Sequence, residues 1–131
     1  MSDIDSIDGI IRTFYEVISG PAGVPRQWER DAELYLPQAL FFQVRRDDTI
    51  RVETKAQYNA RVEPWLMEHG FFEYEVAREV QQYGKVAHVM STYESRYAMD
   101  GPVIGGGKNS IQLVHDGTRW WIASAAWNSA L

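Results

Sequence analysis

The sequence predicts an α+β fold in which N-terminal helices pack in the concave face of a curved antiparallel sheet. Three observations lead to this prediction. Helical apolar periodicity occurs only before residue 70, and longer strand patterns follow it. Asp116-Gly117, a dipeptide typical of a tight hairpin turn, separates two apolar runs within residues 109–127. Large apolar side chains occur on both faces of the second run, at Trp120, Trp121 and Ile122, so we expect this strand to be covered on both sides.

Length and composition favour one ordinary globular domain over residues 1–131. The net charge of −5 argues against nucleic acid as a partner, because phosphate contacts require a basic face. No stretch approaches the roughly 20 apolar residues of a membrane span. The acidic N-terminus MSDIDSIDG lacks the features of a secretory signal, and the chain has no cysteine. A cytoplasmic protein is therefore expected.

The first helix is expected from the N-terminus to about Ser19. Ser2 and Asp5 have the spacing of an N-terminal cap, and the Gly20–Gly23 segment (GPAG) ends the periodic pattern. Pro25 is suited to the first turn of a short second helix that carries Trp28. One helix face of the first segment is apolar, with side chains at Ile4, Ile7, Ile11, Phe14, Val17 and Ile18.

Two short strands and a further helix are expected next. The strands cover residues 33–36 and 40–44, separated by Pro37-Gln38, and residues 45–48 form a solvated turn. Thr54 and Gln57 have the spacing of a capping box, which opens a helix closed by His69-Gly70. We expect a kink or restart at Pro64, which has no backbone N–H. The apolar side of this helix contains Tyr58, Val62, Trp65 and Leu66.

A four-strand antiparallel meander completes the prediction, with strands at 71–83 and 86–97 before the hairpin of 109–127. In the first strand, Glu73, Glu75 and Glu79 alternate with apolar residues, so we interpret them as a solvated face. Residues 99–108 are expected to be a flexible loop at a pocket mouth or a dimer edge. Their GGGK run does not match a phosphate-binding loop, which requires glycine in place of Pro102 and serine or threonine in place of Asn109.

The order of these elements, the AHVMSTYESRY strand and the closing NSIQLVHDGTRWWIASAAW segment resemble the nuclear-transport-factor-2-like (NTF2-like) superfamily. Its members include ketosteroid isomerase, scytalone dehydratase, polyketide cyclases and the small subunits of ring-hydroxylating dioxygenases. The resemblance extends from about Asp3 to Trp127 and is greatest to a bacterial branch without an assigned activity. It implies a cystatin-like α+β cone that encloses a pocket and forms a homodimer through the outer sheet face.

The catalytic residues of these relatives are not retained in a recognisable form. Ketosteroid isomerase-like sequences place a basic Asp before a Pro in the early strand region, where this chain has Leu36 before Pro37. Leucine cannot abstract a proton. A scytalone dehydratase-like site requires a His–carboxylate pair, but His88 and Glu94 lie six residues apart on one strand, a separation of about 20 Å.

Aromatic residues are the principal pocket candidates, because a small-molecule site is usually an apolar cleft with a few polar groups. For each of them, an ordinary place in the core is the alternative. The predicted ligand-binding residues are Tyr15, Trp28, Tyr35, Tyr58, Trp65, Ser91, Tyr93, Asn109, Gln112 and Trp127.

Tyr15, Tyr35 and His88 are the only catalytic candidates. A histidine pKa near 6.5 suits proton transfer. However, Ala87 and Val89 form the better core pair, which favours the outer face for His88. No close histidine spacing indicates a metal site, and no cofactor is expected.

Three functions therefore stay open. The first, which we prefer, is a binding domain for a small apolar or aromatic molecule. The second is an isomerase, dehydratase or cyclase that uses general acid–base chemistry on such a molecule. The third is a dimeric interaction subunit like those of the dioxygenases. A titratable side chain pointing into the pocket would favour the second over the first.

Overall fold

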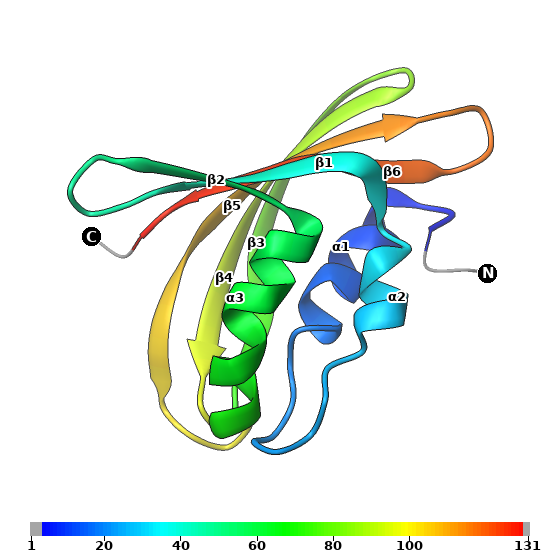
Figure 1. Ribbon diagram of the computed structural model, residues 1–131. Helices are drawn as coiled ribbons and strands as arrows, with labels where there is room; N and C mark the ends of the chain where they lie inside the picture. The colour runs from blue at the N-terminus through cyan, green and yellow to red at the C-terminus, as the bar shows by residue number, and fades with distance from the viewer. Residues whose placement is uncertain (1–3, 130–131) are drawn as a thin grey trace.

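The computed structural model describes residues 4–129 and contains three helices and one six-stranded sheet (Figure 1). The predicted α+β class is confirmed. The last four strands form the predicted antiparallel meander, namely β3 (Phe72–Tyr83), β4 (Val86–Arg96), β5 (Val103–His115) and β6 (Trp120–Asn128). All three helices lie on the concave side of the curved sheet (Figure 1).

The early strands differ from the prediction. One strand, β1 (Tyr35–Val44), replaces the two short ones and passes through Pro37. It pairs in parallel with β6 and antiparallel with β2 (Ile50–Thr54), so the sheet is mixed. The register against β6 shifts between Tyr35 and Leu40, and proline is tolerated at such an irregularity because no ladder hydrogen bond is lost.

The helices follow the predicted order with different limits. In α1 (Ile7–Glu16), the Ser6 side chain caps the N-terminus, whereas the predicted cap at Ser2 lies outside the described residues. The short α2 covers Trp28–Ala32.

The third helix, α3 (Lys55–Glu68), begins with both hydrogen bonds of the predicted capping box. Pro64 does not interrupt it. Because Ala60 and Pro64 are both exposed, water can bond the Ala60 carbonyl that loses its N–H partner. Within the described part of the chain, no helix is long and apolar enough to cross a membrane.

The prediction of a flexible loop over 99–108 is wrong for its glycines. Gly105–Gly107 lie within β5 and pair with Tyr93–Ser95 of β4. A Cβ atom at Gly106 would stand 2.7 Å from the Tyr93 carbonyl oxygen. The glycine therefore allows a close approach of two strands, which is one of the established uses of glycine inside a sheet.

The alternation predicted for β4 is confirmed, and its inward-facing side chains lie on the concave face of the sheet. Ala87, Val89 and Ser91 are buried there, against a core that includes Ile10 and Ile11 of α1. The expectation of a solvated glutamate face on β3 is wrong for Glu73 and Glu75. The register places them opposite Ser95 and Tyr93, so they share the concave face, and of the three glutamates only Glu79 is exposed.

Candidate functional site

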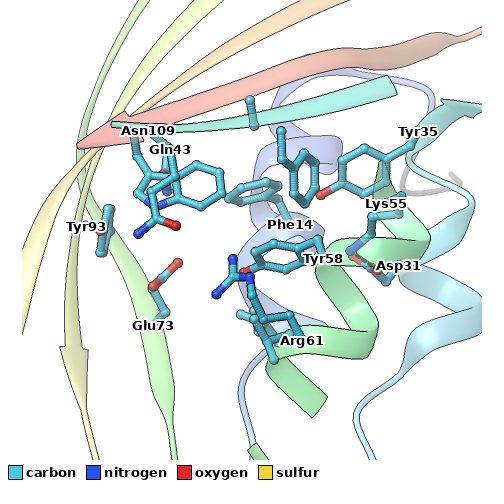
Figure 2. A pocket seen from close by; sticks show the side chains of 15 residues that line it. Phe14, Asp31, Tyr35, Gln43, Lys55, Tyr58, Arg61, Glu73, Tyr93 and Asn109 are labelled. Carbon is cyan, nitrogen blue, oxygen red and sulfur yellow. Dashed lines mark ion pairs between the residues drawn. The ribbon is translucent and has the colours of Figure 1, made fainter. Parts of the chain in front are cut away.

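A cavity of about 180 Å³ lies between the concave sheet face and the helices (Figure 2). An apolar cavity of roughly 150 Å³ holds one benzene molecule, so a ring-sized ligand fits this space. Side chains from α1, α2, α3 and five strands contribute to its wall. The aromatic members are Phe14, Tyr35, Phe41, Tyr58, Tyr93 and Trp127.

The aromatic wall is organised around Phe41 of β1. Its ring centroid lies 5.4 Å from that of Tyr35, 4.6 Å from that of Tyr58 and 5.9 Å from that of Trp127. The contacts with Tyr58 and Trp127 are edge-to-face, an arrangement that aromatic pairs favour. Strand alternation brings Phe41 inward from the centre of β1, so this packing fixes the wall of the cavity.

One end of the cavity contains a buried ion pair between α2 and α3. The Lys55 Nζ lies 2.6 Å from Asp31 Oδ2 and donates to Asn59 Oδ1 at 2.7 Å. Burial raises the pKa of Asp31 and lowers that of Lys55, and in each case the partner's charge opposes the shift. The Nζ lies between 4.9 and 5.6 Å from the centroids of four rings, those of Trp28, Tyr35, Phe41 and Tyr58.

The other end contains Glu73, next to Tyr93 and Asn109 (Figure 2). No hydrogen bond from the described residues reaches the Glu73 carboxylate, and burial raises the pKa of Glu73 to about 7. The residue keeps part of its surface open, because it also borders a groove of about 520 Å³ between α1 and β3. Burial, followed by the charge of Glu73, raises the pKa of Tyr93 to about 12.

Arg61 of α3 borders the cavity, but its charge is already paired. Its guanidinium group donates to both oxygens of Glu53, at 2.9 Å for the closest contacts, and lies 5.5 Å from the Tyr58 ring centroid. Within residues 4–129, no cluster of three His, Asp or Glu side chains is arranged to hold a metal ion.

A buried hydrogen-bond chain holds Asn109 in the cavity wall. Asn109 Nδ2 donates to the Tyr15 hydroxyl at 3.2 Å, and this hydroxyl lies 2.7 Å from Ser91 Oγ. Ser91 in turn donates to Glu75 at 2.5 Å, and Arg78 binds the same carboxylate through two nitrogens. Burial raises the pKa of Tyr15 to about 12, so the hydroxyl stays protonated at neutral pH.

The structure brings together half of the predicted ligand-binding residues. Tyr35, Tyr58, Tyr93, Asn109 and Trp127 line the cavity. Their role in binding stays a prediction.

The other predicted residues lie outside the lining. Tyr15 and Ser91 are behind it in the hydrogen-bond chain. Trp28 faces Lys55, and Trp65 stacks on His69 at 4.5 Å with 40% of its surface exposed.

The convex face of the sheet holds the remaining two candidates. Gln112 alternates with buried Ile111 and Leu113, and it donates to the Ala87 carbonyl. His88 bonds Ser110 at 2.7 Å on the same face. The preference for an outward-facing His88 is confirmed, and this position separates it from the cavity.

Sequence reasoning missed the charged residues of the cavity, chiefly Asp31, Lys55 and Glu73. Lys55 was detectable, because it lies three residues before Tyr58 and so extends the inward face of α3. Glu73 was not detectable, because Phe72 and Tyr74 beside it on β3 are apolar and so predict that they face the core and that Glu73 faces the solvent.

Comparison with known proteins relates this architecture to a set of solved structures. A protein of unknown function with a cystatin-like fold from Nostoc punctiforme is 10% identical, with a TM-score of 0.73 over 93% of this chain and 86% of that one. An NTF-2 like protein of unknown function from Silicibacter pomeroyi is 11% identical, with a TM-score of 0.65 over 92% and 90% of the two chains. The chain has the cystatin-like, NTF2-like fold.

A third structure with this NTF2-like fold is described as a putative ketosteroid isomerase, from Shewanella frigidimarina. It is 12% identical, with a TM-score of 0.63 over 94% of this chain and 95% of that one. No protein-family model and no curated protein matches the sequence. At these identities the similarity establishes the fold, and function has to be argued from the cavity.

Proposed function

We propose that this protein binds a small, ring-sized molecule in the cavity between the helices and the sheet. The size of the cavity and its aromatic wall support the proposal, because rings pack favourably on aromatic faces and edges. The polar groups at the two ends, Asp31 with Lys55 and Glu73 with Asn109, favour a ligand that carries a polar substituent.

Ligand-observed NMR with a panel of ring compounds tests this proposal. The double variant Trp127→Ala with Tyr93→Ala removes two walls of the cavity and should weaken binding at least about tenfold. Trp65→Ala with Tyr97→Ala is the matched control, because this Trp–Tyr pair lies outside the cavity lining. Equal affinity in both double variants would place the binding site elsewhere.

A second candidate function is proton transfer on the bound molecule, and the state of Glu73 favours it. A general base works best when its pKa is near the ambient pH, and Glu73 has a pKa of about 7 with no hydrogen bond from a described residue. We therefore propose Glu73 as the acid–base group of an isomerase-type reaction. The fold shared with a putative ketosteroid isomerase agrees with this reaction class.

Isomerisation of cyclohex-3-enone to the conjugated enone, followed by absorbance, tests this second function. Glu73→Gln should lower kcat/KM by roughly 100-fold or more, and the wild-type rate should rise with pH to a midpoint near 7. Glu79→Gln, at an exposed position of the same strand, should leave the rate unchanged. Full activity in Glu73→Gln would exclude this role.

We also propose that two copies associate through the convex face of the sheet. Half-buried apolar side chains lie on this face, including Phe42 of β1, Met90 of β4 and Trp121 of β6.

A further inference from the structure

We propose that Lys55 forms an imine with a small aromatic or cyclic aldehyde or ketone in the cavity, with Asp31 as its proton-transfer partner. This inference rests on the proposed function, because the carbonyl compound is the ring-sized ligand of that cavity.

The position of Lys55 carries the first step of the argument. It is the first residue of α3, and the Thr54 capping box immediately before it fixes the helix start. The side chain is 16% exposed and that of Asp31 is 5% exposed, yet both border the cavity. A ligand in the cavity therefore meets the amine directly, whereas the solvent largely does not.

The surroundings of the amine favour nucleophilic chemistry. An exposed lysine at pH 7.4 carries a free amine in only about one molecule in a thousand, because its pKa is near 10.4. Desolvation disfavours the ammonium form, and it lowers the pKa of Lys55 against the opposing charge of Asp31. Asp31, only 2.6 Å from Nζ, is placed to accept the proton that the amine must lose.

The four rings around Nζ suit the product as well as the resting state. Each centroid lies 4.9 to 5.6 Å from Nζ, within the range of a cation–π interaction. A protonated imine is a cation at the same nitrogen. The four rings and the Asp31 carboxylate therefore stabilise the protonated imine through the same contacts that they make with the ammonium group.

The reaction balances with the groups present. Asp31 takes one proton from the Lys55 ammonium, and the free amine attacks the carbonyl carbon to form a C–N bond. A proton moves from this nitrogen to the former carbonyl oxygen, which gives a neutral carbinolamine. Asp31 then returns its proton to the hydroxyl, the C–O bond breaks and water leaves. The net change converts an ammonium and a carbonyl into a protonated imine and water, with the charge conserved.

Reductive trapping tests the inference on the wild-type protein. The protein is incubated with benzaldehyde or cyclohexanone and sodium cyanoborohydride at pH 7.4, and the modified lysines are mapped by peptide mass spectrometry. The chain has three lysines, Lys55, Lys85 and Lys108, and the last two are exposed. We expect at least about tenfold more adduct at Lys55 than at either exposed lysine.

Three variants refine this test. Lys55→Arg keeps the positive charge beside Asp31 and should abolish the selective adduct, whereas Lys85→Arg should leave the adduct at Lys55 unchanged. Asp31→Asn should slow adduct formation at Lys55 without moving it to another lysine. Adduct yields at Lys55 no higher than those at Lys85 and Lys108 would overturn the inference.

Binding of the same two compounds, measured by ligand-observed NMR without reductant, separates this inference from the proposed function. If benzaldehyde or cyclohexanone binds and Lys55 is not selectively modified, the imine chemistry is wrong and the binding function stands. If neither these compounds nor the wider panel binds, both are wrong.

Discussion

Glu73 and Glu75 show that the surroundings of a carboxylate determine whether it is available to a ligand. They lie two positions apart on β3 and face the same side of the sheet. Glu75 accepts hydrogen bonds from Arg78 and Ser91. The Glu73 carboxylate receives none from the described residues and borders an aromatic cavity. Of these two carboxylates, Glu73 is the one available to a ligand.

The raised pKa of Glu73 predicts a pH-dependent stability. The folded protein holds this proton up to a pH of about 7, whereas the unfolded chain releases it near 4.5. Stability should therefore fall as the pH rises from 4.5 to about 7, by up to about 3 kcal/mol from this group. Glu73→Gln should remove this loss. Urea unfolding of both proteins at pH 4.5 and pH 8 measures the difference.

The expected result is that Glu73→Gln gains stability relative to the wild type only at the higher pH. Glu79→Gln on the same strand controls for the general effect of removing one negative charge, because its side chain is exposed. An identical advantage of Glu73→Gln at both pH values would contradict the assignment.

At the scale of elements, Arg26 links the segment that connects α1 and α2 to the C-terminal end of α3 by hydrogen bonds. Its guanidinium group, on a residue that is only 6% exposed, donates to backbone carbonyl oxygens of both segments. The acceptors are those of Ile18, Gly20, Pro21, Val24, Leu66 and His69. Carbonyls at a helix C-terminus attract cations, so the contacts to α3 gain from the helix dipole.

Replacement of Arg26 by lysine should destabilise the protein by about 2 kcal/mol, because an ammonium group cannot reach both segments and leaves buried carbonyls unpaired. Urea unfolding measures this loss. Arg12→Lys, on the exposed side of α1, should change the stability by no more than about 0.5 kcal/mol. Equal losses of stability in the two variants would show that the Arg26 hydrogen bonds do not hold these segments together.

At the scale of the whole molecule, the curved sheet separates two surfaces with different surroundings. The concave face and the helices enclose the cavity, and the convex face holds His88, Gln112 and the apolar side chains of the proposed interface. The same alternation along each strand that places Phe41 inward places Phe42 outward.

We expect a homodimer in solution, at twice the 15.1 kDa mass of the chain. Phe42→Glu introduces a charge into the proposed interface and should produce monomers in sedimentation equilibrium experiments. Val80→Glu, at an exposed position of β3, is the control and should stay dimeric. A monomeric wild-type protein, or a dimeric Phe42→Glu variant, would contradict the proposed interface.

Local patterns in the sequence were sufficient for much of the fold. The apolar periodicity of α1, the Thr54 capping box of α3 and the alternation of Ala87, Val89 and Ser91 all involve neighbours within a few residues. Such patterns are determined by the geometry of a single helix or strand. The α+β class and the antiparallel meander follow from the order of these patterns along the chain.

The remaining features of the fold and of the cavity depended on contacts between segments that are far apart in the sequence. The parallel pairing of β1 with β6 joins residues more than 80 positions apart, and Ile50 and Val52 of β2 are too exposed to give a clear strand pattern. The register of β3 against β4 turned Glu73 inward, and the position of α2 relative to the start of α3 paired Asp31 with Lys55. A one-residue change of register reverses the face of every side chain, so the charged ends of the cavity depended on the tertiary structure.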